Sequence, residues 1–155
     1  MKAWRLTKAR HKSLDGIGGE IAEGRWHRRG QRIIYAAASP SLAVLEVLVH
    51  LDLSPDLLPD DYILIEIDIP DDIETIRTKR DDLPDGWDFF DGLAARVVGV
   101  KWLDDGETAV MLVPSVVVPE ENIVLINPVH SHAGKIVEVS NRPFRFDPRL
   151  LTPRS

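Results

Sequence analysis

The chain contains no cysteine among its 155 residues, which excludes disulfides, thiolate metal sites and a cysteine nucleophile. No apolar run approaches the roughly 18 residues of a membrane span, and the first residues lack the apolar segment of a signal peptide. Basic residues are not in excess: the net charge is -6, whereas a nucleic-acid-binding surface is normally basic. We therefore expect a cytoplasmic protein without direct nucleic-acid or membrane binding.

The residues that are present indicate an ordered globular chain. Hydrophobic residues make up 44% of the sequence and charged residues 28%, an ordinary composition for a folded protein. The length suits one domain with a modest core. The sequence shows no internal repeat and no low-complexity tract.

Stretches with strand character and stretches with helix character follow one another irregularly. Residues 63–69 alternate apolar and polar side chains, which is typical of a half-buried strand. Ser39 followed by Pro40 is typical of a helix start, and we expect this helix to end near His50. Because regular βαβ alternation is missing, the pattern favours an α+β fold with a mainly antiparallel or split sheet. Further strands are expected at 3–6, 32–39, 108–119, 122–128 and 134–146, a second helix at 93–103, and a loop with at most a short helix at 70–92.

One carboxylate, Glu46, interrupts the apolar helix that follows Pro40. Burying an unpaired carboxylate costs several kcal/mol, so Glu46 needs either solvent or a partner. It could share a narrow exposed strip with His50, four residues later on the same helix face. It could instead point into a cleft, where its charge would serve catalysis. The helix alone does not decide between these two interpretations.

Two arginines and two hydroxyl-bearing residues are further candidates. Arg5 lies in a short apolar strand, where it could form a structural ion pair, and Arg25 lies in a basic loop, where it could be a surface charge. Either arginine could instead bind phosphate, for which a guanidinium fork is well suited. Tyr35 is either a core residue or a ring that stacks on a planar ligand. Ser115 stands alone in an apolar segment, where most serines bond the backbone.

Two different kinds of function, metal-dependent hydrolysis and non-catalytic binding, are also compatible with these residues. Glu46 and His50, together with His130 and His132, are ligand types that could hold zinc in a metal-dependent hydrolase. A non-catalytic binding module is equally compatible with the composition.

Several motifs, in their order and spacing, resemble the RES domain family. They are GRW at 24–26, the stretch YAAASPSLAVLEVLVHL from residue 35, and VPSVVVPEENIVLINP from residue 113, with AWRL at 3–6 and GVKWL at 99–103 in support. The resemblance predicts a single RES domain over 1–155, with a core of about 3–145 and a tail at 146–155. His27 departs from the pattern, which has asparagine after GRW.

The resemblance implies a toxin of a type II toxin–antitoxin pair, with a fold similar to the ADP-ribosyltransferases that bind NAD⁺. Members of the family hydrolyse or phosphorolyse NAD⁺, or transfer its ADP-ribose to a protein, and their antitoxins carry a helix-turn-helix DNA-binding region. The matching motifs place the family's catalytic and NAD⁺-binding residues on Arg25, Tyr35, Glu46 and Ser115, with Arg5 and Asn127 as further candidates. NAD⁺ is then a substrate, and no resident cofactor or metal is expected.

The chemistry of NAD⁺ cleavage suits these residue types. Breaking the nicotinamide–ribose bond builds positive charge on the sugar, which an anion such as Glu46 stabilises in the transition state. Because nicotinamide leaves as a neutral ring, one carboxylate can suffice where glycosidases use two. In this interpretation Arg25 and Arg5 hold the pyrophosphate, Tyr35 stacks on nicotinamide or ribose, and Ser115 bonds the ribose or braces an arginine.

Overall fold

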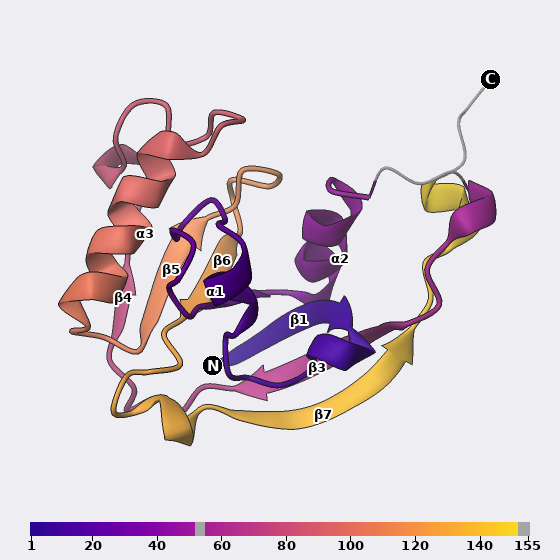
Figure 1. The fold of residues 1–155 in the computed structure, drawn as a ribbon, viewed down its shortest axis with the longest axis horizontal. Helices are drawn as coiled ribbons and strands as arrows, with labels where there is room; N and C mark the ends of the chain where they lie inside the picture. The colour runs from indigo at the N-terminus through magenta and orange to yellow at the C-terminus, as the bar shows by residue number, and fades with distance from the viewer. Residues whose placement is uncertain (52–54, 152–155) are drawn as a thin grey trace.

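The computed structural model describes residues 1–51 and 55–151, which form one seven-stranded sheet with three α-helices (Figure 1). The strand order is β4-β5-β6-β2-β1-β3-β7. Within this sheet only β4 and β5 run parallel, and all other neighbours are antiparallel. The strands are β1 (Lys2–Lys8), β2 (Ile34–Ala37), β3 (Tyr62–Asp68), β4 (Thr75–Arg77), β5 (Val110–Pro114), β6 (Asn122–Ile126) and β7 (Val137–Phe144); the helices are α1 (Gly18–Ile21), α2 (Pro40–Leu48) and α3 (Leu93–Asp105).

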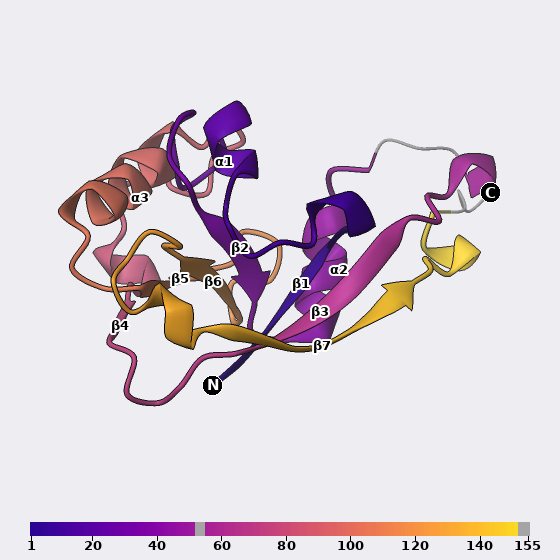
Figure 2. The same cartoon turned by 60° about the horizontal axis from the view of Figure 1, so that its bottom comes forward.

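The sheet is divided into two halves at its centre. β1 and β2 share a single register pair, Trp4 with Ala37, whereas β1 and β3 are paired along seven residues. β4, β5, β6 and β2 form one half, and β1, β3 and β7 form the other. Figures 1 and 2 show that the strands of the two halves run in different directions. This split, mainly antiparallel sheet with flanking helices confirms the predicted fold class.

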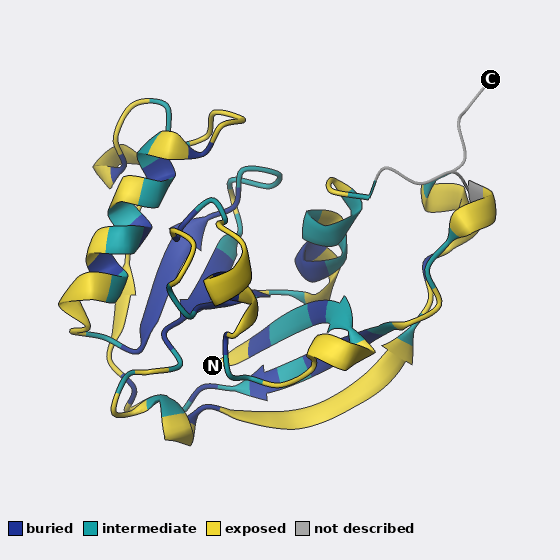
Figure 3. Cartoon of the chain, in the orientation of Figure 1, coloured by how far each residue is buried: buried dark blue, intermediate teal, exposed yellow. Residues whose placement is uncertain are grey.

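The alternation of side chains along each strand assigns the strand residues to one of two faces of the sheet. On one face, here called the helix face, Leu6, Tyr35, Val113 and Leu125 pack with residues of α2 and α3. On the opposite face, Ala3, Ile34 and Val124 pack with the three isoleucines of β3. Figure 3 shows β5 and β6 buried and the edge strand β7 exposed. Strand residues one position apart therefore belong to different cores.

The helix α3 approaches the GRW segment very closely through a glycine. A Cβ on Gly99 would lie 1.8 Å from the carbonyl oxygen of Trp26. The buried side of α3 consists of Ala95, Gly99 and Trp102, while the apolar residues Leu93 and Val97 are 60% and 70% exposed. The prediction of a helix here is confirmed, but small residues select the packed side because they allow the backbone of Trp26 to come near.

Three other local predictions change in the structure. Residues 70–92 contain the short strand β4 and a 3-10 turn at Arg80–Asp82 where only a loop or a short helix was expected. α2 ends at Leu48, two residues before His50. Phe146, expected in the tail, is 4% exposed and packs in the core of the helix face. Residues 52–54, in the segment between α2 and β3, lie outside the described residues.

Among the described residues, no helix is long and apolar enough to cross a membrane.

Candidate functional site

Glu46 and Ser115 meet across the fold. The Ser115 hydroxyl donates a 2.6 Å hydrogen bond to Glu46 Oε1, although 69 residues separate the two in the chain. Ser115 is fully buried, and Glu46 is half-buried. The Ser115 oxygen also accepts from the backbone N–H groups of Val117 and Val118, both at 3.0 Å. Two fixed donors therefore orient the hydroxyl so that its single proton points at the carboxylate.

A second contact fastens the start of α2 to the same region. Ser39 caps the helix by accepting from the N–H of Leu42 at 3.1 Å. Its hydroxyl donates to Glu121 Oε1 at 2.7 Å, and the Glu121 carbonyl accepts from the N–H of Ser115 at 2.9 Å. Helix α2 is thus tied to the turn between β5 and β6 at Ser39 and again at Glu46. These ties hold the Glu46 carboxylate at the carboxyl end of β5.

The surroundings of Glu46 show how a carboxylate is accommodated on this apolar helix. The helix is less enclosed than its apolar sequence indicates, because Leu45 is 37% and Val49 57% exposed. Glu46 therefore needs no fully buried counterion, yet it does not stand on a merely solvated strip, since a buried hydroxyl binds it. With Oε1 bound by Ser115, Glu46 has its second carboxylate oxygen to present to a ligand.

Arg25 is held by a loop that sequence reasoning did not connect to it. Its Nη1 donates to the carbonyl oxygens of Trp87 at 3.1 Å and Phe89 at 2.7 Å. The preceding residue, Gly24, donates its N–H to the His27 carbonyl at 3.2 Å, which closes a tight turn around Arg25 and Trp26. The guanidinium has three further N–H donors to offer an anion.

Tyr35 lies on the helix face and is bound by the same turn. Its hydroxyl oxygen accepts from the N–H of Trp26 at 3.1 Å and lies 2.7 Å from Nδ1 of His27. Burial raises the pKa of Tyr35, against the hydrogen bond from Trp26 and the charges of Arg96 and Arg25, so the phenol stays protonated. Because its hydroxyl is engaged, Tyr35 has its aromatic ring to offer a ligand.

Arg96 is a residue of this region that the sequence analysis missed. It extends from α3, and its Nε donates to the carbonyl of Gly24 at 2.9 Å. Its Nη1 lies 3.9 Å from Glu23 Oε2. The side chain is 19% exposed, so its charge contributes to the field at Tyr35 and His27. No signal in the sequence pointed to Arg96, because its contact is with a backbone carbonyl and depends on which side of α3 is packed.

The structure pairs Glu46 with Ser115 and places Tyr35 against the turn that carries Arg25, and it leaves Arg5 and Asn127 apart from both sets. Arg5 follows the alternation of Ala3 and so belongs to the opposite face from Tyr35; its Nη1 donates to the Ser13 carbonyl at 3.3 Å. Burial lowers the pKa of Arg5, and Asp15 opposes that shift. Asn127 is buried just after β6 and accepts from the N–H of Val129. Ser115 lies beyond the other end of β6, so about 20 Å of strand separates it from Asn127.

The candidate metal ligands are dispersed. His130 and His132 pack their rings against each other at 5.3 Å, and His50 is exposed near the end of α2. The part of the chain that the structure describes holds no group of three or more histidine and carboxylate side chains placed to bind one metal ion.

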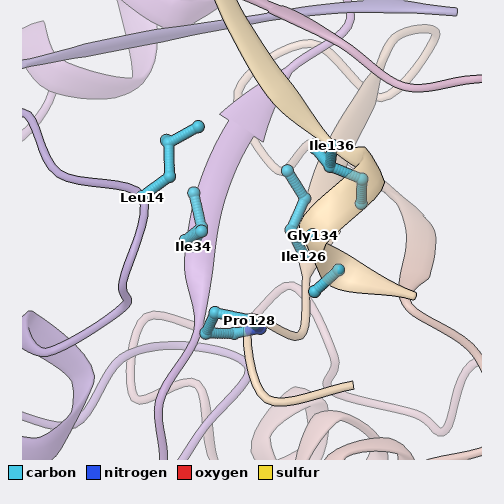
Figure 4. Close-up of a pocket in the computed structure, with 7 residues that line it drawn as sticks. Leu14, Ile34, Ile126, Pro128, Gly134 and Ile136 are labelled. Atoms are coloured by element: carbon cyan, nitrogen blue, oxygen red, sulfur yellow. The ribbon is translucent and has the colours of Figure 1, made fainter. Parts of the chain in front are cut away.

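Two hollows of the surface lie apart from the Glu46–Ser115 pair. One of about 210 Å³ is on the opposite face, where Leu14, Ile34, Ile126, Pro128 and Ile136 are among the residues that line it (Figure 4). The other, of about 680 Å³, runs along the outer side of α3 and includes Arg96 and Val97.

Comparison with known proteins places the chain in a family. The RES domain family model matches residues 2–147. A protein of Sphingobium sp. (strain YBL2) named Prs ADP-ribosylating toxin is 40% identical over 156 residues, which cover 96% of this chain and 95% of the relative. A protein of Pseudomonas putida named Toxin Res is 35% identical over 151 residues, covering 97% and 100%.

A solved structure shares the fold. It belongs to the M. tuberculosis MbcT–MbcA toxin–antitoxin complex and superimposes with a TM-score of 0.75, covering 97% of this chain and 86% of that one at 18% identity. The family model and the relatives confirm the family resemblance seen in the sequence. The chain belongs to the RES domain family, among relatives that are named as toxins.

Proposed function

We propose that the chain is the toxin of a toxin–antitoxin pair and consumes NAD⁺ by cleaving its nicotinamide–ribose bond. The observation that carries this proposal is the hydrogen bond from buried Ser115 to Glu46. It presents a carboxylate on the helix face of the sheet, the face that also holds Tyr35 and packs on Trp26 beside Arg25. These are the residues that the RES motifs select.

The Glu46–Ser115 pair supplies what the cleavage requires. As the bond to nicotinamide breaks, the ribose gains positive charge, and a negative oxygen near it lowers the barrier. Ser115 holds Oε1, which fixes the carboxylate plane and leaves Oε2 to face the sugar or to orient an attacking group. Because the leaving nicotinamide is neutral, the reaction needs no second carboxylate as an acid.

Arg25 and Tyr35 supply binding. With Nη1 committed to Trp87 and Phe89, Arg25 keeps donors for the pyrophosphate in a rigid orientation. Tyr35, with its hydroxyl engaged by Trp26 and His27, offers a ring whose position is fixed. Fixed groups of this kind lower the entropic cost of placing a substrate. Arg5 and Asn127 remain predicted NAD⁺ contacts from the family motif, although they lie apart from this group.

The partner proposed for this toxin is an antitoxin with a helix-turn-helix region. An enzyme that consumes NAD⁺ harms its own cell unless it is restrained, so a partner that covers or enters the site is required. The names of the relatives and the toxin–antitoxin complex of the structural neighbour support such a partner. The helix-turn-helix region follows from the family resemblance.

The direct test is NAD⁺ loss and nicotinamide release by the chain made in a cell-free system. Glu46→Gln keeps the shape and an acceptor for Ser115 but removes the charge, and we expect turnover to fall by about 10²–10³-fold. Glu74→Gln, at an exposed position, is the matched control and should keep the wild-type rate. Wild-type turnover by Glu46→Gln would refute the proposal.

Product analysis then identifies the acceptor. ADP-ribose indicates water, and ADP-ribose 1-phosphate formed only in phosphate buffer indicates phosphorolysis. Label transferred from NAD⁺ to a cellular protein indicates ADP-ribosyl transfer, the activity in the name of the Sphingobium relative. In growing cells, a collapse of NAD⁺ on induction supports the first two outcomes, and growth arrest at constant NAD⁺ supports the third.

A further inference from the structure

His27 is the position at which the chain departs from its family pattern, and the structure gives it two specific contacts. The ring is buried, with 4% exposure. Nε2 lies 2.8 Å from the carbonyl oxygen of Ala22, and Nδ1 lies 2.7 Å from the Tyr35 hydroxyl. The ring therefore bridges the segment before the GRW motif and the strand β2.

These contacts select one form of the imidazole. A carbonyl oxygen can only accept, so Nε2 of His27 carries a proton and donates it to Ala22. In the neutral ring Nδ1 is then an acceptor, and the Tyr35 hydroxyl donates to it. The Tyr35 oxygen in turn accepts from the N–H of Trp26. The neutral ring thus completes a chain of three hydrogen bonds in which every donor has an acceptor.

His27 is also connected to Arg25, because both belong to the turn of residues 24–27. The carbonyl of His27 accepts from the N–H of Gly24, and the carbonyl of Gly24 accepts from Arg96. There is no room for a side chain at Gly24, since a Cβ there would lie 2.6 Å from the Tyr35 hydroxyl and 2.9 Å from the His27 ring. A shift of His27 therefore moves Tyr35 and the backbone that presents Arg25 together.

We propose that His27 is a positioning residue for NAD⁺, and that only its neutral form, protonated on Nε2, holds Tyr35 and Arg25 in their binding arrangement. This inference rests on the proposed function, because it gives the two residues their roles. Histidine at this position accepts from the Tyr35 hydroxyl and at the same time donates to the Ala22 carbonyl.

Protonation of His27 turns Nδ1 from the acceptor of the Tyr35 hydroxyl into a donor. Both ring nitrogens then donate, and the Tyr35 oxygen receives two N–H groups while its own proton loses its acceptor. The added charge lies near Arg96, whose field opposes it, and near Glu23, whose field favours it. Burial is the largest influence and lowers the pKa of His27, so the neutral form prevails at neutral pH. The binding arrangement is expected to fail as the pH falls through that lowered pKa.

The test compares pH profiles of NAD⁺ turnover for the wild type, His27→Asn and His27→Leu. For the wild type we expect kcat/KM to fall about tenfold per pH unit on the acid side, through KM more than kcat. An asparagine side chain can accept from Tyr35 but cannot gain a proton, so His27→Asn should lose this limb and retain more activity than His27→Leu. His27→Leu should raise KM about tenfold at every pH. His11→Asn, at an exposed histidine, should keep the wild-type profile.

A spectroscopic measurement separates this inference from the proposed function. Ring ¹⁵N shifts of His27, recorded on the Glu46→Gln chain, should show protonated Nε2 and unprotonated Nδ1. Tyr35→Phe removes the donor to Nδ1 and should raise the pKa of His27. The opposite tautomer, an unchanged pKa in Tyr35→Phe, or an acid limb that His27→Asn shares with the wild type would each overturn the inference. If the wild type shows no NAD⁺ turnover, the proposed function fails, while the nitrogen shifts still decide whether His27 holds Tyr35.

Discussion

The hydrogen bond between Ser115 and Glu46 predicts a measurable coupling between two residues far apart in the chain. Ser115→Ala removes a 2.6 Å bond to a carboxylate and the acceptor of two backbone N–H groups, all around a fully buried oxygen. A hydrogen bond to a charged group contributes about 1.5–3 kcal/mol, and each donor left without a partner adds to the loss. We expect the free energy of unfolding to fall by about 3 kcal/mol, equivalent to about 6–12 °C in Tm.

A double-mutant cycle isolates the part that belongs to the pair. Urea unfolding of Ser115→Ala, Glu46→Ala and the double variant should give a coupling free energy of about 1–2 kcal/mol, since the side chains are in direct contact. Ser140 donates to Glu66 at 3.1 Å on the exposed side of β7 and β3, and the same cycle there should give less than about 0.5 kcal/mol. Additive effects at Ser115 and Glu46 would show that the hydroxyl does not bind the carboxylate in solution.

Four other expectations follow from the contacts described above. Arg25→Lys should lower kcat/KM for NAD⁺ by about 10–100-fold in steady-state assays, mainly through KM, because an ammonium cannot both bond two carbonyls and present a planar fork. Gly99→Ala should cost about 3 kcal/mol or more in urea unfolding, because its Cβ would meet the Trp26 carbonyl at 1.8 Å. The pKa of His27 is lowered in the folded chain, so the unfolded chain takes up the proton first; stability should fall as the pH drops below about 6.5, and His27→Asn should lose this part of the slope. NAD⁺ turnover should persist in excess chelator, whereas a metal-dependent hydrolase that uses Glu46 as a ligand would lose its activity there.

Local patterns in the sequence predicted most elements because those elements obey local rules. The strand predicted over 63–69 and the Ser39–Pro40 start of α2 are confirmed. β4 was not predicted, since three exposed residues in an aspartate-rich segment become a strand only by pairing with β5. Tertiary pairing of this kind leaves no periodic signal in the strand itself.

The candidate site was accessible from the sequence only through the family motifs. Spacing along the chain does not show that Ser115 meets Glu46, because the contact spans 69 residues. The engagement of Arg25 by the carbonyls of Trp87 and Phe89 depends on backbone atoms, which residue types do not reveal. The packed side of α3 was hidden because close approach at Gly99, rather than apolar spacing, determines it.

The strand order of the sheet has a consequence for synthesis on the ribosome. Chains emerge from the N-terminus, and early segments can fold only with partners that already exist. β2, which carries Tyr35, pairs with β6 near residue 124. Glu46 can form its hydrogen bond only after Ser115 has been made. β1 can pair with β3 well before that point, whereas Tyr35 and Glu46 acquire their partners Leu125 and Ser115 only after those later residues have been translated. Under the proposed function, we therefore expect a chain that stops before β6 to be inactive toward NAD⁺, because Tyr35 then lacks its partner strand.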